Sequence, residues 1–306
     1  FLLAPREDGE EGAYARMASQ VSEKVTVRCI PRFGRSFFVA IGLKTLSPDI
    51  VHCHLGRAAR IVGRLRGRFK TVATLHGDYK SKDYSRFDQL VCIAKWQTDD
   101  IPDTFGGGIA TIPNFLDDRL EDERTRRDDD VLAALNIPLG ARVIGSVGRF
   151  TCEKGFDVLI SAFERMAGPK DYLILVGDGP DAEALRELAG DQVRFTGWVD
   201  QPSTVISVLD LFVLPSHHEA FGLALLEAMN LGCPVLAANA HGPSELLREI
   251  PEALVPCGDA KEMARAMRRL LDDPTALRGS WPAPPGLVGR VLCPRARRPP
   301  AWACLR

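Results

Sequence analysis

Short apolar runs alternate with segments of helical periodicity along most of this chain. The runs are about four to seven residues long and continuously apolar, which is typical of strands buried on both faces of a parallel sheet. Strands that alternate with helices predict an α/β fold in which helices cover both faces of the sheet. We expect strands at residues 1–4, 25–30, 49–53, 71–75, 89–93 and 109–112, then at 143–147, 172–176, 192–195, 211–214, 235–238 and 253–255.

The two sets of strands predict two Rossmann-like, doubly wound domains facing a cleft. Residues 117–130 read DDRLEDERTRRDDD and contain almost no apolar side chain, which indicates a polar linker. We therefore assign 1–137 to the first domain, with its linker at 117–137, and 138–280 to the second. The Pro/Arg-rich tail at 281–306 supports neither helix nor strand, so we expect a frameshifted ending or, alternatively, a disordered interaction segment.

Composition narrows the classes of function and the compartment. The 39 basic and 40 acidic side chains nearly balance, which argues against a nucleic-acid partner. The eight cysteines form no CxxC pair, as expected for reduced thiols in a cytosolic protein. We find neither an apolar run long enough to span a membrane nor a secretion leader, so we expect a cytoplasmic protein. The alternative is a protein bound peripherally to the inner face of the cytoplasmic membrane.

An anion site is predicted where the strand at 143–147 ends. Gly148 and Arg149 follow that strand, and Lys154 lies just before the next helical pattern. A helix N-terminus favours negative charge, and an arginine can bind two phosphate oxygens at once. Solvated surface cations are the alternative interpretation. Neither of the common phosphate-binding loops, GxxxxGK followed by Ser or Thr and GxGxxG, is present.

Two carboxylates, Glu219 and Glu227, flank an apolar segment that opens with Phe221, Gly222 and Leu223. One precedes a predicted helix and the other lies within it, an arrangement that suits the binding of sugar hydroxyls. Glu227 is surrounded in sequence by apolar residues, which indicates a partly buried helix rather than an exposed one. A buried carboxylate needs hydrogen-bond donors, and ribose hydroxyls qualify.

The order and spacing of these patches resemble the retaining glycosyltransferases of family 4, which have the GT-B fold. The resemblance rests on eight patches: Gly148-Arg149, Glu153-Lys154-Gly155, 176–179, 195–197, 219–223, Glu227-Ala228-Met229, 232–235 and 242–245. It implies a metal-independent enzyme without a cofactor, whose donor is a nucleotide diphosphate sugar.

The resemblance also implies roles for individual residues. Arg149 and Lys154 would hold the donor diphosphate, Glu219 would face the donor sugar, and Glu227 would bind the ribose. The other donor-binding residues that it implies are Gly148, Gly177, Trp198, Val199, Phe221, Gly222, Leu223 and Glu245.

The first half is less similar to that family. His76, at the end of a strand and before Gly77, resembles the histidine that reaches the donor sugar. We place His54 and Gly12 on the acceptor side, although the glycines around Gly12 are not adjacent as in the family. His52 and His54 share one face of a strand, but without a third ligand nearby we expect no metal.

We expect helices at 11–22 and 57–68. A basic face is predicted on the second of them. Its arginines recur at steps of three and four, namely Arg57, Arg60, Arg64 and Arg68. A solvated helix is the simple interpretation, and binding to an anionic membrane surface is the alternative.

The sequence thus predicts transfer of a sugar from a nucleotide diphosphate sugar to a hydroxyl of a glycan or glycolipid, with retention. No side chain stands out as a nucleophile, so we expect front-face attack assisted by the departing phosphate. The resemblance points to bacterial lipopolysaccharide or cell-surface polysaccharide assembly. The alternatives are a nucleotide-sugar epimerase or phosphorylase on the same fold, and an inactive, truncated nucleotide-binding protein.

Overall fold

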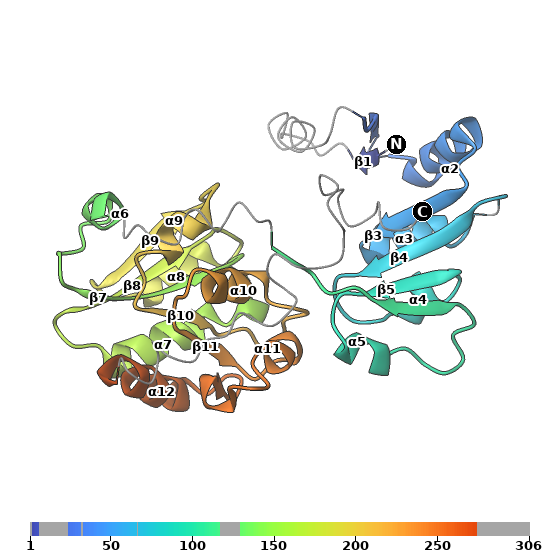
Figure 1. Ribbon diagram of the computed structural model, residues 1–306. Coiled ribbons are helices and arrows are strands. Elements are labelled where there is room, and N and C mark those ends of the chain that lie inside the picture. The colour runs from blue at the N-terminus through green and yellow to red at the C-terminus, as the bar shows by residue number, and fades with distance from the viewer. Residues whose placement is uncertain (1, 6–23, 32, 66, 117–128, 274–306) are drawn as a thin grey trace. The chain divides into compact units, whose positions relative to one another are not determined.

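The computed structural model describes residues 2–5, 24–31, 33–65, 67–116 and 129–273. The chain forms two compact units (Figure 1). The first comprises Phe1–Cys92 and Gln97–Ile112, and the second comprises Ile93–Trp96 and Pro113–Arg306. Among the described residues, no helix has the length and apolar character needed to cross a membrane.

The first unit contains parallel strands and short helices. Strands β1 (Leu2–Pro5) and β2 (Val27–Ile30) form a parallel pair. A four-stranded parallel sheet has the order β3-β4-β5-β6, with strands at Ile50–His54, Lys70–Leu75, Gln89–Cys92 and Gly108–Thr111. The helices are α2 (Arg35–Leu46), α3 (Gly56–Val62) and α4 (Ser81–Tyr84). A fourth helix, α5 (Trp96–Asp99), begins at the last residue of the segment that belongs to the second unit.

The second unit is built on a six-stranded parallel sheet in the order β12-β11-β10-β7-β8-β9. In chain order its strands are Arg142–Val147, Asp171–Val176, Val193–Gly197, Leu211–Leu214, Val235–Ala238 and Leu254–Val255. Starting from β7, this is the doubly wound order 3-2-1-4-5-6, whose ligands bind outside the carboxyl ends of the strands.

Helices lie on both faces of this sheet (Figure 1). They are α6 (Asp129–Ala134), α7 (Phe156–Met166), α8 (Ala182–Leu188), α9 (Pro202–Ile206), α10 (Leu223–Asn230), α11 (His241–Leu246) and α12 (Ala260–Asp272), with short 3-10 turns η2 (Cys152–Lys154) and η3 (Pro251–Ala253). Helix α12 begins after Asp259, whose carboxylate accepts hydrogen bonds from the amides of Lys261 and Glu262. Its buried side chains include Met263, Met267 and Leu270, which recur at helical spacing.

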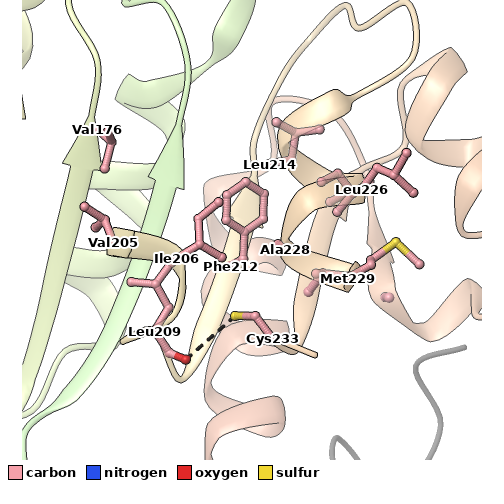
Figure 2. Packing of buried hydrophobic residues seen from close by; sticks show 14 of the residues in the cluster. Val176, Val205, Ile206, Leu209, Phe212, Leu214, Leu226, Ala228, Met229 and Cys233 are labelled. Atoms are coloured by element: carbon pink, nitrogen blue, oxygen red, sulfur yellow. Dashed lines mark hydrogen bonds between the residues drawn. The ribbon is translucent and has the colours of Figure 1, made fainter. Parts of the chain in front are cut away.

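The core of the second unit forms where α9 and α10 pack on the sheet. Phe212 of β10 is completely buried among side chains from both helices (Figure 2). Cys233 lies at the edge of the same cluster, and its thiol donates to the carbonyl of Leu209 across 3.7 Å. Burial raises the pKa of this thiol far above its usual range. Cys233 is therefore an inert core residue.

The α/β fold that the sequence predicts is present, with a strand at each of the twelve expected positions. The helix expected at 57–68 is shorter: α3 ends at Val62, and Gly63 is its C-cap. Glycine is a poor helix former, and here it ends the helix six residues early. The helix expected at 11–22, the linker at 117–128 and the tail at 281–306 lie outside the described residues.

The units divide at a different place from the predicted boundary at 137/138. The chain enters the second unit at Pro113, and α6 belongs to that unit. Leu132 and Ile137 are buried in the same cluster as Phe212 and Leu226. Their burial could not be read from the polar sequence that precedes them.

Candidate functional site

A cavity of about 200 Å³ lies in the second unit at the carboxyl ends of β7 and β10, which are parallel neighbours. Its wall combines the ends of these strands with the 3-10 turn η2 and the first turn of α10. The lining residues are Ser146, Val147, Gly148, Arg149, Lys154, Phe156, Leu214, Pro215, Ser216, Glu219, Leu223 and Ala224. The position is the one at which doubly wound sheets bind their ligands.

Two loops pack closely to form one side of the cavity. Gly155 has a φ of 63°, and a Cβ there would lie 2.3 Å from the carbonyl oxygen of Pro215. The amide of His217 also donates to the carbonyl of Glu153 across 2.9 Å. These contacts explain why glycine follows Lys154, and they hold the lysine beside the loop that carries Glu219.

Lys154 and Glu219 form an ion pair across 2.6 Å inside the cavity. Their side chains are only 27% and 15% exposed, so both charges are largely removed from water and need each other. Arg149 lines the same cavity but is exposed, and it forms no salt bridge with any described residue. The structure thus brings Arg149, Lys154 and Glu219, which the sequence analysis placed in one site, to the wall of one cavity.

The first turn of α10 faces the cavity through Leu223 and Ala224. Its N-cap is Gly222, with a φ of 97°, and no side chain caps the first amides. The open end of this helix therefore presents N–H groups and a partial positive charge. Phe221 does not line the cavity but is buried in the core beneath it.

Glu227 lies three and four residues after Ala224 and Leu223, hence on the same side of α10. Burial raises the pKa of its carboxyl. The carboxylate accepts no hydrogen bond from any residue in the described part of the chain. A half-buried acid of this kind is suited to bind hydroxyl groups of a ligand.

Gly177 has a packing role. Its φ is 138°, and a Cβ there would lie 1.9 Å from the carbonyl oxygen of Gly148. The turn after β8 thus packs its backbone directly on the turn after β7, supported by the bond from the Phe150 amide to the Asp178 carbonyl, 2.9 Å long. Gly177 shapes the loop that carries Arg149 and does not itself line the cavity.

Glu245, which we predicted to bind the donor, already has two partners. Its oxygens accept hydrogen bonds from the amides of Lys95 and Trp96, at 2.9 and 3.1 Å. The Trp96 indole N–H in turn donates to the carbonyl of Ala220 across 2.8 Å, and its ring lies 4.6 Å from that of His241. All of these residues belong to the second unit. In this structure Glu245 anchors the segment that holds Ala220, the residue after Glu219.

Trp198 and Val199 follow β9 and do not line the cavity. Trp198 is 78% exposed, and its indole N–H donates to Asp200 across 3.2 Å. Val199 packs against the core cluster. An exposed tryptophan ring at the end of a strand is free to stack on a flat ligand group, so their predicted place beside the base stays a prediction.

Sequence reasoning missed two buried hydroxyls in the cavity wall, those of Ser146 and Ser216. Both side chains are at most 1% exposed, and neither Oγ atom has a hydrogen-bond partner among the described residues. A signal existed for Ser146, because it interrupts the apolar run VIGSV of a buried strand.

The first unit brings three histidines together at the carboxyl ends of β3 and β4. His54 Nδ1 lies 2.9 Å from His76 Nε2, and His52 Nε2 lies 2.8 Å from the hydroxyl of Thr74. Burial, with the neighbouring His54 and His76, lowers the pKa of His52 to about 4. Among the residues that the structure describes, neither these histidines nor any other group of three His, Cys, Asp or Glu side chains is arranged so that it could hold a metal ion. Gly12 lies outside them.

The basic face predicted on α3 is not formed as expected. Arg64 and Arg68 lie beyond the end of the helix, and Arg60 pairs with the buried Asp83 across 2.6 Å. A second cavity, of about 520 Å³, instead lies beside the exposed Arg68, Lys70 and Arg86. Its wall includes Leu65 and Phe69, so cationic and apolar groups adjoin.

Solved structures place the fold in the GT-B class of glycosyltransferases. HepE of Anabaena, in a structure with UDP and glucose, superposes with a TM-score of 0.74 at 20% identity, covering 90% of this chain and 83% of that one. Sucrose-phosphate synthase of Thermosynechococcus elongatus superposes with a TM-score of 0.68 at 25% identity, covering 81% and 72%.

The chain belongs to the family described as glycosyl transferases group 1, whose model matches residues 141–273. It is 36% identical over 241 residues to the lipopolysaccharide core biosynthesis glycosyltransferase LpsD of Rhizobium meliloti, and 34% identical over 236 residues to LpsE of the same organism. These alignments cover 76% and 74% of this chain, and 67% and 66% of the two relatives.

Proposed function

We propose that this protein transfers a sugar from a nucleoside diphosphate sugar to a hydroxyl of a glycan or glycolipid acceptor, in lipopolysaccharide core assembly. The observation that carries the proposal is the cavity with the Lys154–Glu219 pair, the exposed Arg149 and the open N-terminus of α10. The names of LpsD and LpsE support the acceptor class, and the UDP and glucose of HepE support the donor class.

The charges in this site suit a departing diphosphate. The bond to the donor sugar breaks with the electron pair moving to the phosphate oxygen, where negative charge grows. Arg149, the ammonium of Lys154 and the N–H groups of α10 all favour that charge, which lowers the barrier. When phosphate oxygens take the ammonium as their partner, Glu219 becomes free to accept hydrogen bonds from sugar hydroxyls.

We further propose that the configuration at the sugar is retained. Glu219 is the one carboxylate that lines the cavity among the described residues, and in this proposal hydrogen bonds to sugar hydroxyls occupy it once phosphate has taken Lys154, so it does not act as a nucleophile. Attack of the acceptor on the same face, with the leaving phosphate taking its proton, then needs no covalent enzyme intermediate. NMR of the product's anomeric proton would test this, and an inverted product would contradict it.

Metal independence is part of the same proposal. The side chains of Arg149 and Lys154, with the partial positive charge at the N-terminus of α10, supply the positive charge at the diphosphate. Turnover should therefore be the same in EDTA as in Mg²⁺.

Glu227 is proposed to bind the ribose hydroxyls, which would give its half-buried carboxylate the donors it lacks.

The proposal is tested with the full chain and a panel of UDP, GDP, ADP and their sugars. A ligand that binds only the folded state raises the melting temperature, so one nucleoside diphosphate should do so. The matching sugar nucleotide is then incubated with a lipopolysaccharide core acceptor, and transfer is followed by mass spectrometry. Release of a free altered sugar would indicate an epimerase. Binding with neither release nor transfer would indicate an inactive nucleotide-binding protein.

We also propose that the first unit meets an anionic membrane surface. Support comes from two exposed cations that line the second cavity, Arg68 and Arg86, beside the apolar Leu65 and Phe69. Arg64, which precedes Leu65 in the chain, is exposed as well. Cations next to apolar groups suit the boundary between lipid headgroups and acyl chains. Arg57 is exposed as well and can add to this surface, whereas Arg60 is engaged by Asp83.

A further inference from the structure

Two histidine rings of the first unit are held together by the register of a parallel strand pair. His54, the last residue of β3, pairs with Thr74 of β4, and His76 lies two residues beyond Thr74. The ring centroids of His54 and His76 are 5.2 Å apart, and those of His52 and His54 are 4.5 Å apart. The sheet itself thus sets the spacing of the three rings.

The hydrogen bonds of these rings are separate. His54 Nδ1 lies 2.9 Å from His76 Nε2, whereas His52 Nε2 is bonded to the hydroxyl of Thr74 across 2.8 Å. His52 therefore packs on His54 without sharing the bond between His54 and His76. Between two neutral rings, this bond can contain one proton, carried either by His76 Nε2 or by His54 Nδ1.

The two arrangements differ in tautomer. If His76 Nε2 carries the proton, both rings are Nε2–H tautomers, the form that a free neutral histidine side chain prefers. If His54 Nδ1 carries it, both rings are in the less stable form. Both residues are exposed, but partial desolvation of their rings lowers the pKa of each, and the charge of His54 lowers that of His76 further, which favours the neutral pair.

We infer that His54 is a positioning residue: its Nδ1 accepts a hydrogen bond from Nε2–H of His76, which leaves His76 Nδ1 unprotonated as an acceptor for a sugar hydroxyl. The tautomer rests on the geometry of the pair together with the preference of a neutral histidine for the Nε2–H form, and it needs no substrate. The hydrogen bond from a sugar hydroxyl to His76 Nδ1 rests on the proposed function, because it needs a sugar substrate at His76. An imidazole whose second nitrogen is fixed by a partner presents a single hydrogen-bonding role to a ligand.

The backbone that follows His54 is closely constrained. Leu55 follows it with a φ of 71° and a ψ of 145°, a conformation that residues other than glycine rarely adopt. Gly56 then begins α3, and a Cβ there would lie 2.7 Å from the carboxylate of Asp83. The end of β3 is therefore tightly constrained on the side of α3.

The test is ¹⁵N NMR of the imidazole nitrogens in the full chain, labelled at histidine and held at pH 8 without substrate. The chain has six histidines, so single His→Gln variants assign the signals. We expect His76 Nε2 at the shift of a protonated nitrogen and His76 Nδ1 at that of an unprotonated one. The reverse pattern, or averaged shifts at both nitrogens, would overturn the inference.

Two substitutions of His54 separate its hydrogen bond from its packing. His54→Leu removes the acceptor, so the His76 nitrogens should move toward averaged shifts. His54→Asn places an amide oxygen near the position of Nδ1 and should restore the pattern. His52→Gln is the control, since it keeps a partner for Thr74 and should leave the His76 signals unchanged. Loss of the pattern in His52→Gln, or its persistence in His54→Leu, would count against the inference.

Activity distinguishes the two parts of the inference. With the donor that the nucleotide panel identifies, kcat/KM should fall about tenfold in His54→Leu, because the loss corresponds to about one hydrogen bond. It should recover in His54→Asn. Altered ¹⁵N shifts with unchanged kcat/KM would contradict the hydroxyl at His76, while the tautomer assignment would stand. Failure of the proposed function would leave the NMR pattern intact.

Discussion

At the scale of single residues, the site is defined by a pair of charges that neutralise each other. Lys154 and Glu219 are both mostly buried and lie 2.6 Å apart, and each offsets part of the cost of burying the other. A diphosphate competes with Glu219 for the ammonium. The pair is thus pre-organised for an anionic ligand without carrying an unbalanced charge beforehand.

Lys154→Ala should lower turnover about tenfold to a thousandfold, because it removes one stabilising group from the departing phosphate. Steady-state transfer kinetics measure the effect. Lys170→Ala is the matched control, since Lys170 is an exposed lysine of the same unit. Thermal unfolding of both variants checks that the fold is kept. Near-normal turnover in a folded Lys154→Ala protein would refute the role of this lysine.

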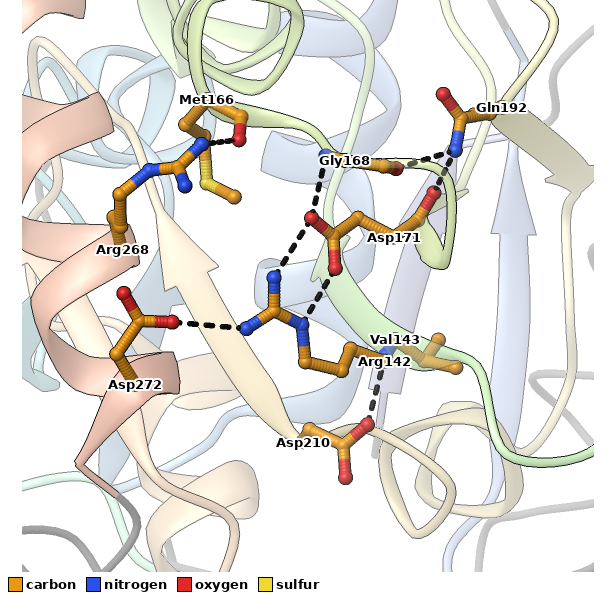
Figure 3. A network of polar contacts seen from close by, with 9 residues as sticks. All are labelled: Arg142, Val143, Met166, Gly168, Asp171, Gln192, Asp210, Arg268 and Asp272. Carbon is orange, nitrogen blue, oxygen red and sulfur yellow. Dashed lines mark hydrogen bonds and ion pairs between the residues drawn. The ribbon is translucent and has the colours of Figure 1, made fainter.

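A second group of charges, remote from the cavity, stabilises the second unit (Figure 3). Asp171 is fully buried and accepts two hydrogen bonds from Arg142, at 2.6 and 2.9 Å, and one from the amide of Gly168. Burial alone would raise the pKa of Asp171, but the bonds from Arg142 and Gly168 outweigh it and hold the pKa below its usual value.

Asp171→Asn should reduce the free energy of unfolding by about 2–3 kcal/mol. The estimate lies below that for a fully buried pair, because the Arg142 side chain is 36% exposed. The contribution of Asp171 is present above the ordinary Asp pKa of 3.8 and is lost as the pH falls through the lower folded pKa. Urea unfolding across that pH range should show that the free energy of unfolding falls more steeply with acid in wild type than in the variant. Glu249→Gln, in an exposed pair with Arg248, is the control and should cost under about 0.5 kcal/mol.

At the scale of elements, close backbone contacts between loops decide the shape of the cavity. Gly242, near the start of α11, lies so near Phe221 that a Cβ would be 2.6 Å from its backbone atoms. The Gly242 amide also donates to the carbonyl of Glu219 across 3.0 Å. Helix α11 therefore supports the loop that carries Glu219 and the beginning of α10.

Gly242→Ala should cost about 1–3 kcal/mol of stability, because the added methyl group meets backbone rather than a movable side chain. Displacing Phe221 should also weaken nucleotide binding, which calorimetry measures. Gly106→Ala is the control, since a Cβ at Gly106 meets nothing within 4 Å. Equal stability and affinity in the two variants would show that the contact does not shape the site.

At the scale of the whole molecule, each unit has its own parallel sheet and its own buried clusters. The second unit carries the cavity with Lys154 and Glu219, and the first carries the histidine pair and the basic surface. The proposed diphosphate site and the proposed membrane contact therefore rest on different units and can be tested separately.

Arg64→Glu, Arg68→Glu and Arg86→Glu together should weaken binding to vesicles of anionic lipid, because each cation near such a surface contributes about 1 kcal/mol. Co-sedimentation measures the bound fraction. A variant with Arg248→Glu, Lys261→Glu and Arg265→Glu is the control, since it makes the same change of charge on exposed residues of the second unit. Equal binding of wild type and both variants, with or without anionic lipid, would sink the membrane proposal.

Much of this protein was readable from local sequence. The twelve strands were predictable because a buried parallel strand must be continuously apolar, and two of them, at 211–214 and 235–238, have the predicted bounds. Arg149 and Lys154 were predictable as an anion site from the strand end and the helix start beside them, whereas Glu219 was joined to them by the resemblance to the family. Local sequence decides the strands and the anion site at the end of one of them.

Tertiary contacts alone decided the rest. Glu245 accepts hydrogen bonds from amides about 150 positions earlier in the chain. Glycine is required at position 177 because a Cβ there would clash with the carbonyl of Gly148. His54 meets His76 through the register of β3 and β4, and α3 ends before Arg64 and Arg68, two of the four arginines that were to share its face. Sequence by itself determined which segments become strands and where charge gathers. The partners of the buried polar groups became definite only when segments distant in the chain packed together, because burial makes hydrogen bonding obligatory without naming the partner.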